Sequence, residues 1–115
     1  MTEAHQNIKT AAIELDGSPL HVRSCGEGLP ILLLHAGIAD SRMWQPLMED
    51  LCCSFQLIAP DLRCYGGSPV PNHAFVYHED LAHLLVHLES DLTWMVGASF
   101  GARIAVNFCL VFLRG

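Results

Sequence analysis

The sequence predicts an α/β protein in which a mostly parallel five-stranded sheet carries helices on both faces. Strand-like apolar runs alternate with amphipathic segments along the 115 residues, and this alternation favours a parallel sheet. The run "ILLLH" has no polar residue before its histidine, as expected for a strand covered on both faces. Hydrophobic residues make up 51% of the chain and charged residues 16%, so the composition is rich in core-forming residues.

The first predicted element is a β-hairpin. Asp16 and Gly17 separate two strand-like runs, residues 9–15 and 18–25, and Asp-Gly between such runs is a strong hairpin signal. Apolar and polar residues alternate in the second run, which predicts one buried face and one polar face. The stretch "GEGLP" then ends the hairpin.

A buried strand and a helix follow the hairpin. We expect the strand at residues 31–35, with a loop after it, and the helix at residues 43–52, where Pro46 suits the first turn. Apolar residues at helical spacing form one stripe on this helix: Trp44, Leu47, Met48 and Leu51.

Two further strands alternate with two further helices. The strands are expected at residues 55–60 and 92–98, and a loop rich in glycine and proline follows the first of them. The helices are expected at residues 77–90 and 100–113. The apolar stripe of the first of these helices is Leu81, Leu84, Leu85 and Leu88.

A Gly-x-Ser-x-Gly pattern lies between the last strand and the last helix. It places Ser99 at a strand-to-helix corner, with Gly97 and Gly101 two residues to either side. Such a corner strains the backbone of its central residue, and side chains at the glycine positions would collide with neighbouring backbone. The Ser99 hydroxyl would stand at the C-terminal edge of the sheet and at a helix N-terminus, where negative charge is favoured. The pattern predicts a nucleophile whose attack generates an oxyanion.

A glycine after the buried strand supports the same chemistry. His35, Ala36 and Gly37 stand where that strand ends, so the N–H of Gly37 is expected to point into a cleft. Together with the N–H of Phe100 it would form an oxyanion hole.

Three motifs in order resemble those of the α/β-hydrolase family. They are "LLLHAGIADSRMW", similar to the family's His-Gly loop, "LIAPDLRCYGGS", similar to its Asp-x-x-Gly-x-Gly-x-Ser loop, and "VGASFGARIA", similar to its nucleophile elbow. The resemblance extends from about Ile13 to Leu110. It implies the N-terminal half of an α/β-hydrolase fold, with strands in the order 1-2-4-3-5.

The resemblance also assigns roles by position. It makes Ser99 the nucleophile, Gly37 and Phe100 the oxyanion donors, and His35 and Asp61 structural residues near the site. Gly66, Gly97 and Gly101 are structural residues of the loop and the elbow. Three positions depart from the family's usual residues, and these departures affect the pocket shape more than the chemistry: Ala36, Cys64 and Ala98.

The family's base and acid are expected to follow the nucleophile. The sixteen residues after Ser99 contain no Asp, Glu or His, and a serine hydroxyl is a weak nucleophile without a base. Of the seven histidines upstream, His78, His83 and His87 are expected at solvated or boundary positions, and the resemblance makes His35 a loop-packing residue. We therefore expect residues 1–115 to be one partial domain, truncated after the elbow helix and inactive as given.

The resemblance also implies an incomplete sheet. Strand five would be an exposed edge carrying Trp94 and Val96, and such edges favour self-association. The last helix would lack neighbours for Phe108, Leu110 and Phe112. We expect the chain to associate with itself through this edge.

Composition limits the other partners. The formal net charge is −6 and there is no basic stripe, so we expect no nucleic acid. The longest apolar stretch is too short for a membrane span. An odd set of five cysteines and a polar N-terminus without a secretory signal favour reduced thiols and a cytoplasmic location. No zinc spacing and no cofactor motif is present, so we expect neither a metal nor a cofactor.

The favoured function is hydrolysis of a small ester-like molecule, or of a related acyl or C–C bond, through a Ser99 acyl-enzyme. A perhydrolase would use the same residues. Relatives with an Asp nucleophile, the dehalogenases and epoxide hydrolases, are disfavoured because position 99 is Ser. A truncated or degenerate protein that acts only by binding is the main alternative. A nucleotide-binding domain is disfavoured because no G-x-G-x-x-G or P-loop follows a strand.

Overall fold

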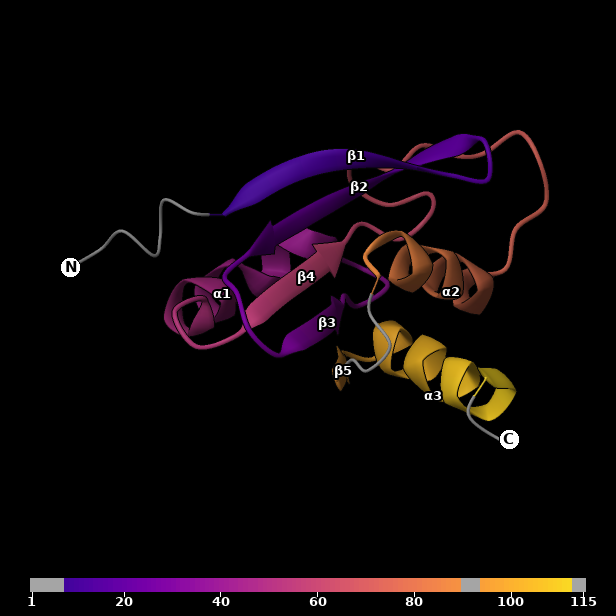
Figure 1. Cartoon of the computed structure of the whole chain (residues 1–115). Coiled ribbons are helices and arrows are strands. Elements are labelled where there is room, and N and C mark those ends of the chain that lie inside the picture. The colour runs from indigo at the N-terminus through magenta and orange to yellow at the C-terminus, as the bar shows by residue number, and fades with distance from the viewer. Residues whose placement is uncertain (1–7, 90–93, 113–115) are drawn as a thin grey trace.

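The fold is a mixed five-stranded sheet with helices on both faces (Figure 1). The structure is a computed structural model that describes residues 8–89 and 94–112. The strand order β1-β2-β4-β3-β5 confirms the prediction. The strands are β1 (Lys9–Leu15), β2 (Ser18–Cys25), β3 (Pro30–Leu34), β4 (Gln56–Pro60) and β5 (Trp94–Gly97), and the α-helices are α1 (Gln45–Leu51), α2 (Tyr77–His87) and α3 (Phe100–Phe112).

The pairing directions divide the sheet into two parts. Strand β2 pairs antiparallel with both β1 and β4, whereas β3 pairs parallel with both β4 and β5. The hairpin turn has positive φ at both Asp16 and Gly17, as a two-residue type I′ turn requires. The parallel strands end at a common edge, and this edge carries the loops that the sequence singled out.

The helices differ from the predictions mainly at their ends. The segment predicted as one helix at 43–52 begins as a 3-10 helix, Ser41–Trp44, capped by the Asp40 carboxylate, and α1 then follows. The predicted ends at residues 90, 92, 93 and 113 lie outside the described residues. Within the described ranges, none of the helices is long and apolar enough to cross a membrane.

Two cores fill the space between the sheet and its helices. Successive residues of β3 face opposite sides, so Leu33 packs against α1 while Leu32 and Leu34 face α2 and α3. Leu81 and Leu84 of the predicted α2 stripe are fully buried in the core between the sheet and helices α2 and α3. Figure 1 shows α2 and α3 side by side on one face of the sheet.

The β5 edge is exposed, but α3 is better covered than the sequence indicated. Trp94 is 65% exposed. Leu110 and Phe112 are also exposed, whereas Phe108 is buried, and its ring centroid lies 4.8 Å from that of Phe112. The prediction that Phe108 lacks neighbours is wrong. Phe108 stands one turn after Ile104 on the helix face that α2 and the sheet cover.

Candidate active site

Ser99 occupies a strained corner between β5 and α3. Its φ is +54°, a conformation that a non-glycine residue adopts only when its surroundings hold it there. The N–H of Ala98 donates to the carbonyl oxygen of Leu34 at 3.0 Å, and the N–H of Gly101 donates to Ala98 at 2.9 Å. These two bonds fix the corner against the end of β3, and the side chain of Ser99 is exposed.

The two flanking glycines allow the corner to form. A Cβ at Gly101 would lie 2.7 Å from the carbonyl oxygen of His35 and would overlap the carbonyl of Leu34. A Cβ at Gly97 would lie 2.6 Å from the carbonyl carbon of Gly101. Real Cβ atoms do not approach backbone so closely. Any larger residue at either position would therefore move the first turn of α3 away from the sheet.

The two amides expected to bind an oxyanion belong to neighbouring residues. A Cβ at Gly37 would lie 3.3 Å from Cβ of Phe100, so the loop after β3 runs directly beside the start of α3. Phe100 is the first residue of α3, and amides in the first turn have no acceptor within their own helix. Among the residues that the structure describes, no acceptor is recorded for the N–H of Gly37 or Phe100.

His35 supports the loops beneath the site. It is fully buried, and its Nε2 accepts the N–H of Leu62 at 3.0 Å. The ring proton therefore lies on Nδ1, which donates to the carbonyl oxygen of Ala36 at 2.7 Å. Both ring nitrogens are used, so His35 positions the loop and does not act as a base for Ser99.

The Asp61 carboxylate links the loops around the site by hydrogen bonds. It accepts the N–H of Ser41 at 2.7 Å, the N–H of Gly67 at 2.8 Å and Nδ1 of His21 at 2.9 Å. Burial disfavours its charge, but these hydrogen bonds outweigh burial and hold the pKa of Asp61 below its usual value. Gly66 has φ +52°, and a Cβ there would overlap this carboxylate.

Tyr65 is a site residue that the sequence did not single out. Its ring centroid lies 5.0 Å from that of His35 and 6.1 Å from that of Phe100, and it lines a shallow cavity of about 620 Å³ with Gly37. No motif marks an aromatic residue at this position. Its neighbour Cys64, which replaces a usual glycine, adopts φ +76°, so the substitution leaves a strained residue in the loop.

Among the residues that the structure describes, no base is hydrogen-bonded to the Ser99 hydroxyl. His21 is paired with Asp61, and His73 contacts the carbonyl oxygen of Asp16 through Nε2. Over residues 8–89 and 94–112, no group of three or more His, Cys, Asp or Glu residues is placed to hold a metal ion.

Comparisons with known proteins place the fold in a family. The family model described as alpha/beta hydrolase fold matches residues 30–112. Epoxide hydrolase 2 of Siraitia grosvenorii is 33% identical over 111 residues, which cover 91% of this chain and 35% of the relative. The soluble epoxide hydrolase of Corynebacterium sp. (strain C12) is 31% identical over 97 residues, 82% of this chain and 34% of the relative.

An esterase and a solved structure are also similar. The pimeloyl-[acyl-carrier protein] methyl ester esterase of Legionella pneumophila (strain Corby) is 28% identical over 88 residues, 76% of this chain and 36% of the relative. The crystal structure of an epoxide hydrolase from Vigna radiata superposes with a TM-score of 0.86 at 26% identity, covering 92% of this chain and 36% of the other. The chain thus spans about a third of the length of these relatives.

Proposed function

Because this chain belongs to the α/β-hydrolase fold family, we propose that it carries the nucleophile and the oxyanion hole of a serine-dependent ester hydrolase. The observation that carries the proposal is the corner at Ser99, with its positive φ and with the Gly37 loop packed beside Phe100. Strain of this kind is retained where it serves a function.

The nucleophile favours an ester over an epoxide as substrate, although several relatives are epoxide hydrolases. A serine oxygen that opens an epoxide forms an ether, which water does not cleave under mild conditions. A serine oxygen that attacks an ester forms a new ester with the substrate's acyl group, and water can hydrolyse it. Only the second reaction regenerates Ser99, and it agrees with the relative described as a methyl ester esterase.

The proposed reaction proceeds through two tetrahedral intermediates. The Ser99 oxygen attacks the ester carbonyl carbon, and the carbonyl oxygen becomes an oxyanion that accepts hydrogen bonds from the N–H groups of Gly37 and Phe100. Collapse of the intermediate expels the alcohol and leaves the acyl group on Ser99. Water then attacks the acyl-enzyme and releases the acid. An oxyanion donor contributes about 3–4 kcal/mol of transition-state stabilisation in known hydrolases.

The base is the part of the mechanism that the described residues do not provide. The proposal therefore assigns proton transfer to a histidine outside these residues, in agreement with the family's order of nucleophile, acid and histidine. The same observation favours a second candidate, a protein that uses this fold only to bind. The two candidates differ in whether Ser99 reacts once a base is supplied.

Chemical rescue with imidazole separates the two candidates. The chain is treated with an alkyl fluorophosphonate at increasing imidazole concentration, and labelled peptides are identified by mass spectrometry. If Ser99 is the nucleophile, its labelling should rise with the imidazole concentration and should be absent in Ser99→Ala. Ser54→Ala is the matched control, because Ser54 is an exposed serine outside the site, and this variant should leave the labelling of Ser99 unchanged. Labelling of Ser99 no faster than of Ser54 at every imidazole concentration would favour the binding protein.

A second probe tests the substrate class. Styrene oxide should leave Ser99 unmodified under conditions in which the fluorophosphonate labels it. Turnover of styrene oxide to its diol by the same chain would contradict the choice of an ester.

A further inference from the structure

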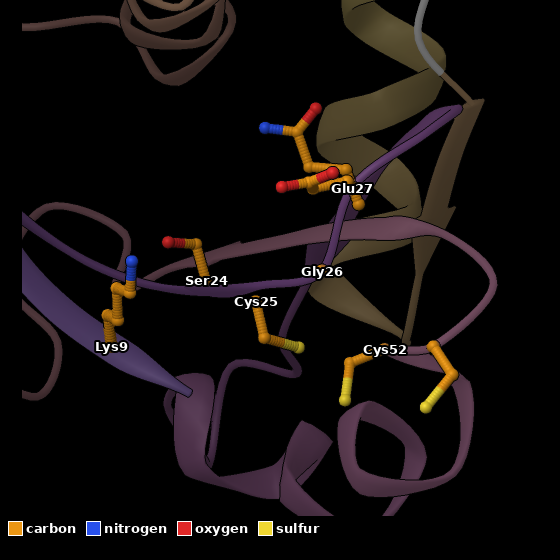
Figure 2. Close-up of a pocket in the computed structure, with 8 residues that line it drawn as sticks. Lys9, Ser24, Cys25, Gly26, Glu27 and Cys52 are labelled. Carbon is orange, nitrogen blue, oxygen red and sulfur yellow. The ribbon is translucent and has the colours of Figure 1, made fainter. Parts of the chain in front are cut away.

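A cavity of about 580 Å³ is lined by residues at the end of β2 and the end of α1 (Figure 2). The strand pairing places it at the edge of the sheet opposite the one that carries Ser99. Cys25 lies there because it pairs with Leu57 near the start of β4, whereas Ser99 follows the end of the parallel strand β5. The lining includes three of the five cysteines, Cys25, Cys52 and Cys53. The proposed hydrolase site uses none of them.

Cys25 and Cys52 are brought together by the ends of two elements. Cys25 is the last residue of β2, and Cys52 caps the C-terminus of α1. Cys25 and Cys52 belong to one core cluster and are 5% and 6% exposed. The Cys25 thiol donates to the carbonyl oxygen of Met48 at 3.9 Å, and the N–H of Cys52 donates to the same oxygen at 3.0 Å. A Cβ at Gly26 would overlap the carbonyl oxygen of Cys52, so only glycine lets the chain after β2 pass this close to α1.

We propose that Cys25 and Cys52 are a modification site at which hydrogen peroxide forms a disulfide between β2 and the end of α1. The Cys52 thiolate attacks one peroxide oxygen, the O–O bond breaks, and the products are Cys52 sulfenic acid and hydroxide. The sulfur of Cys25 then attacks the Cys52 sulfur and displaces hydroxide, which takes up the Cys25 proton as water. Two thiols and one peroxide thus give one disulfide and two waters, with peroxide reduced by two electrons.

The surroundings decide the order of the two steps. Burial and the neighbouring Cys52 sulfur raise the pKa of Cys25 to about 12, so Cys25 remains a thiol at neutral pH and reacts slowly with peroxide. Cys25 and Cys52 both line the cavity, through which peroxide can reach them. Because the Cys25 thiol and the Cys52 N–H both bind the carbonyl oxygen of Met48, Cys25 can reach the sulfenic acid without a large movement of the backbone.

Cys53 is the competing partner, because it is exposed and adjacent to Cys52. A disulfide between neighbouring residues strains the peptide bond that joins them, whereas Cys25 approaches Cys52 from a separate strand. The proposal therefore assigns Cys53 no part in the product, and Cys53→Ser is the matched control variant.

Peptide mapping tests the proposal directly. The wild-type chain is treated with stoichiometric peroxide, alkylated, digested with trypsin and analysed by mass spectrometry. The arginines at 23, 42 and 63 place Cys25 in peptide 24–42 and both Cys52 and Cys53 in peptide 43–63. We expect these peptides to be joined, in wild type and in Cys53→Ser alike, and to separate after reduction with dithiothreitol.

The thermal stability gives a second readout. The disulfide would close the loop between residues 25 and 52, and loop closure of this length predicts a rise in Tm of roughly 10 °C that dithiothreitol reverses. Cys25→Ser should show no rise. Alkylated Cys25 after peroxide, a Cys52–Cys53 link, or sulfinic acid at Cys52 without a cross-link would each overturn the proposal.

Discussion

Replacing Gly101 by alanine tests whether α3 is packed flush against the end of β3. The added methyl would lie 2.6 Å from the carbonyl carbon of Leu34 and 2.7 Å from the carbonyl oxygen of His35, whereas ordinary contacts begin near 3.4 Å. Both groups belong to buried backbone and cannot rotate away. Overpacking lowers the free energy of unfolding by about 1–3 kcal/mol where side chains can adjust. The higher helix propensity of alanine raises it by at most about 1 kcal/mol. We expect a net loss of about 2 kcal/mol or more.

The assay is the free energy of unfolding from urea denaturation of wild type and variant. Gly37→Ala is the matched control, because its Cβ would meet side chains and no backbone: Cβ of Phe100 at 3.3 Å and the hydroxyl of Tyr65 at 3.7 Å. We expect this control to lose less than about 1 kcal/mol. A Gly101→Ala midpoint equal to or above that of wild type would refute the packing on which the position of Ser99 depends.

Four further predictions concern the rest of the fold. Arg63→Met should cost about 3–5 kcal/mol in urea denaturation, because the buried guanidinium pairs with Asp80 and donates to three carbonyl groups of the hairpin; a loss under 1 kcal/mol would contradict this. The pKa of Asp61 is lowered in the folded protein. Its carboxylate therefore stabilises the fold fully above the pKa of an unfolded aspartate, about 4, and this stabilisation is lost as the pH falls below that value. In Asp61→Asn, the free energy of unfolding should therefore change less between about pH 4 and pH 2 than it does in wild type. Equal slopes for the two proteins over this range would show that Asp61 does not cause the pH dependence. Cys64→Gly should raise stability by up to about 1 kcal/mol by relieving the positive φ, and a decrease would count against strain at this residue. Trp94→Lys should reduce the self-association that we propose for the β5 edge, measured by sedimentation, and an unchanged oligomer would place the contact elsewhere.

Local patterns were sufficient to predict the elements and the elbow. Asp16-Gly17 specifies a turn through its own backbone preference, and both residues have positive φ. Glycines at 97 and 101 predict a tight corner because the requirement is steric and lies within five residues. The strand order followed from the family resemblance, since nothing local in β3 or β4 specifies which strands become neighbours.

Contacts between distant segments could not be predicted in the same way. Arg63 reaches the carbonyl oxygens of Leu15 and Ser18, and nothing near Arg63 in the sequence indicates this. The burial of Phe108 depends on the position of α2, which the helix pattern alone does not give. Tyr65 approaches Phe100 only because two loops meet at one edge of the sheet.

We propose that Ser99 faces two backbone amides that can bind an oxyanion. Amide NMR spectra of the chain, recorded before and after Ser99 is phosphonylated with imidazole present, test it most directly. We expect the N–H resonances of Gly37 and Phe100 to move downfield as both amides bind the phosphonyl oxygen, while the resonance of Gly17 in the hairpin turn stays in place. Phosphonylated Ser99 with both resonances unmoved would contradict it.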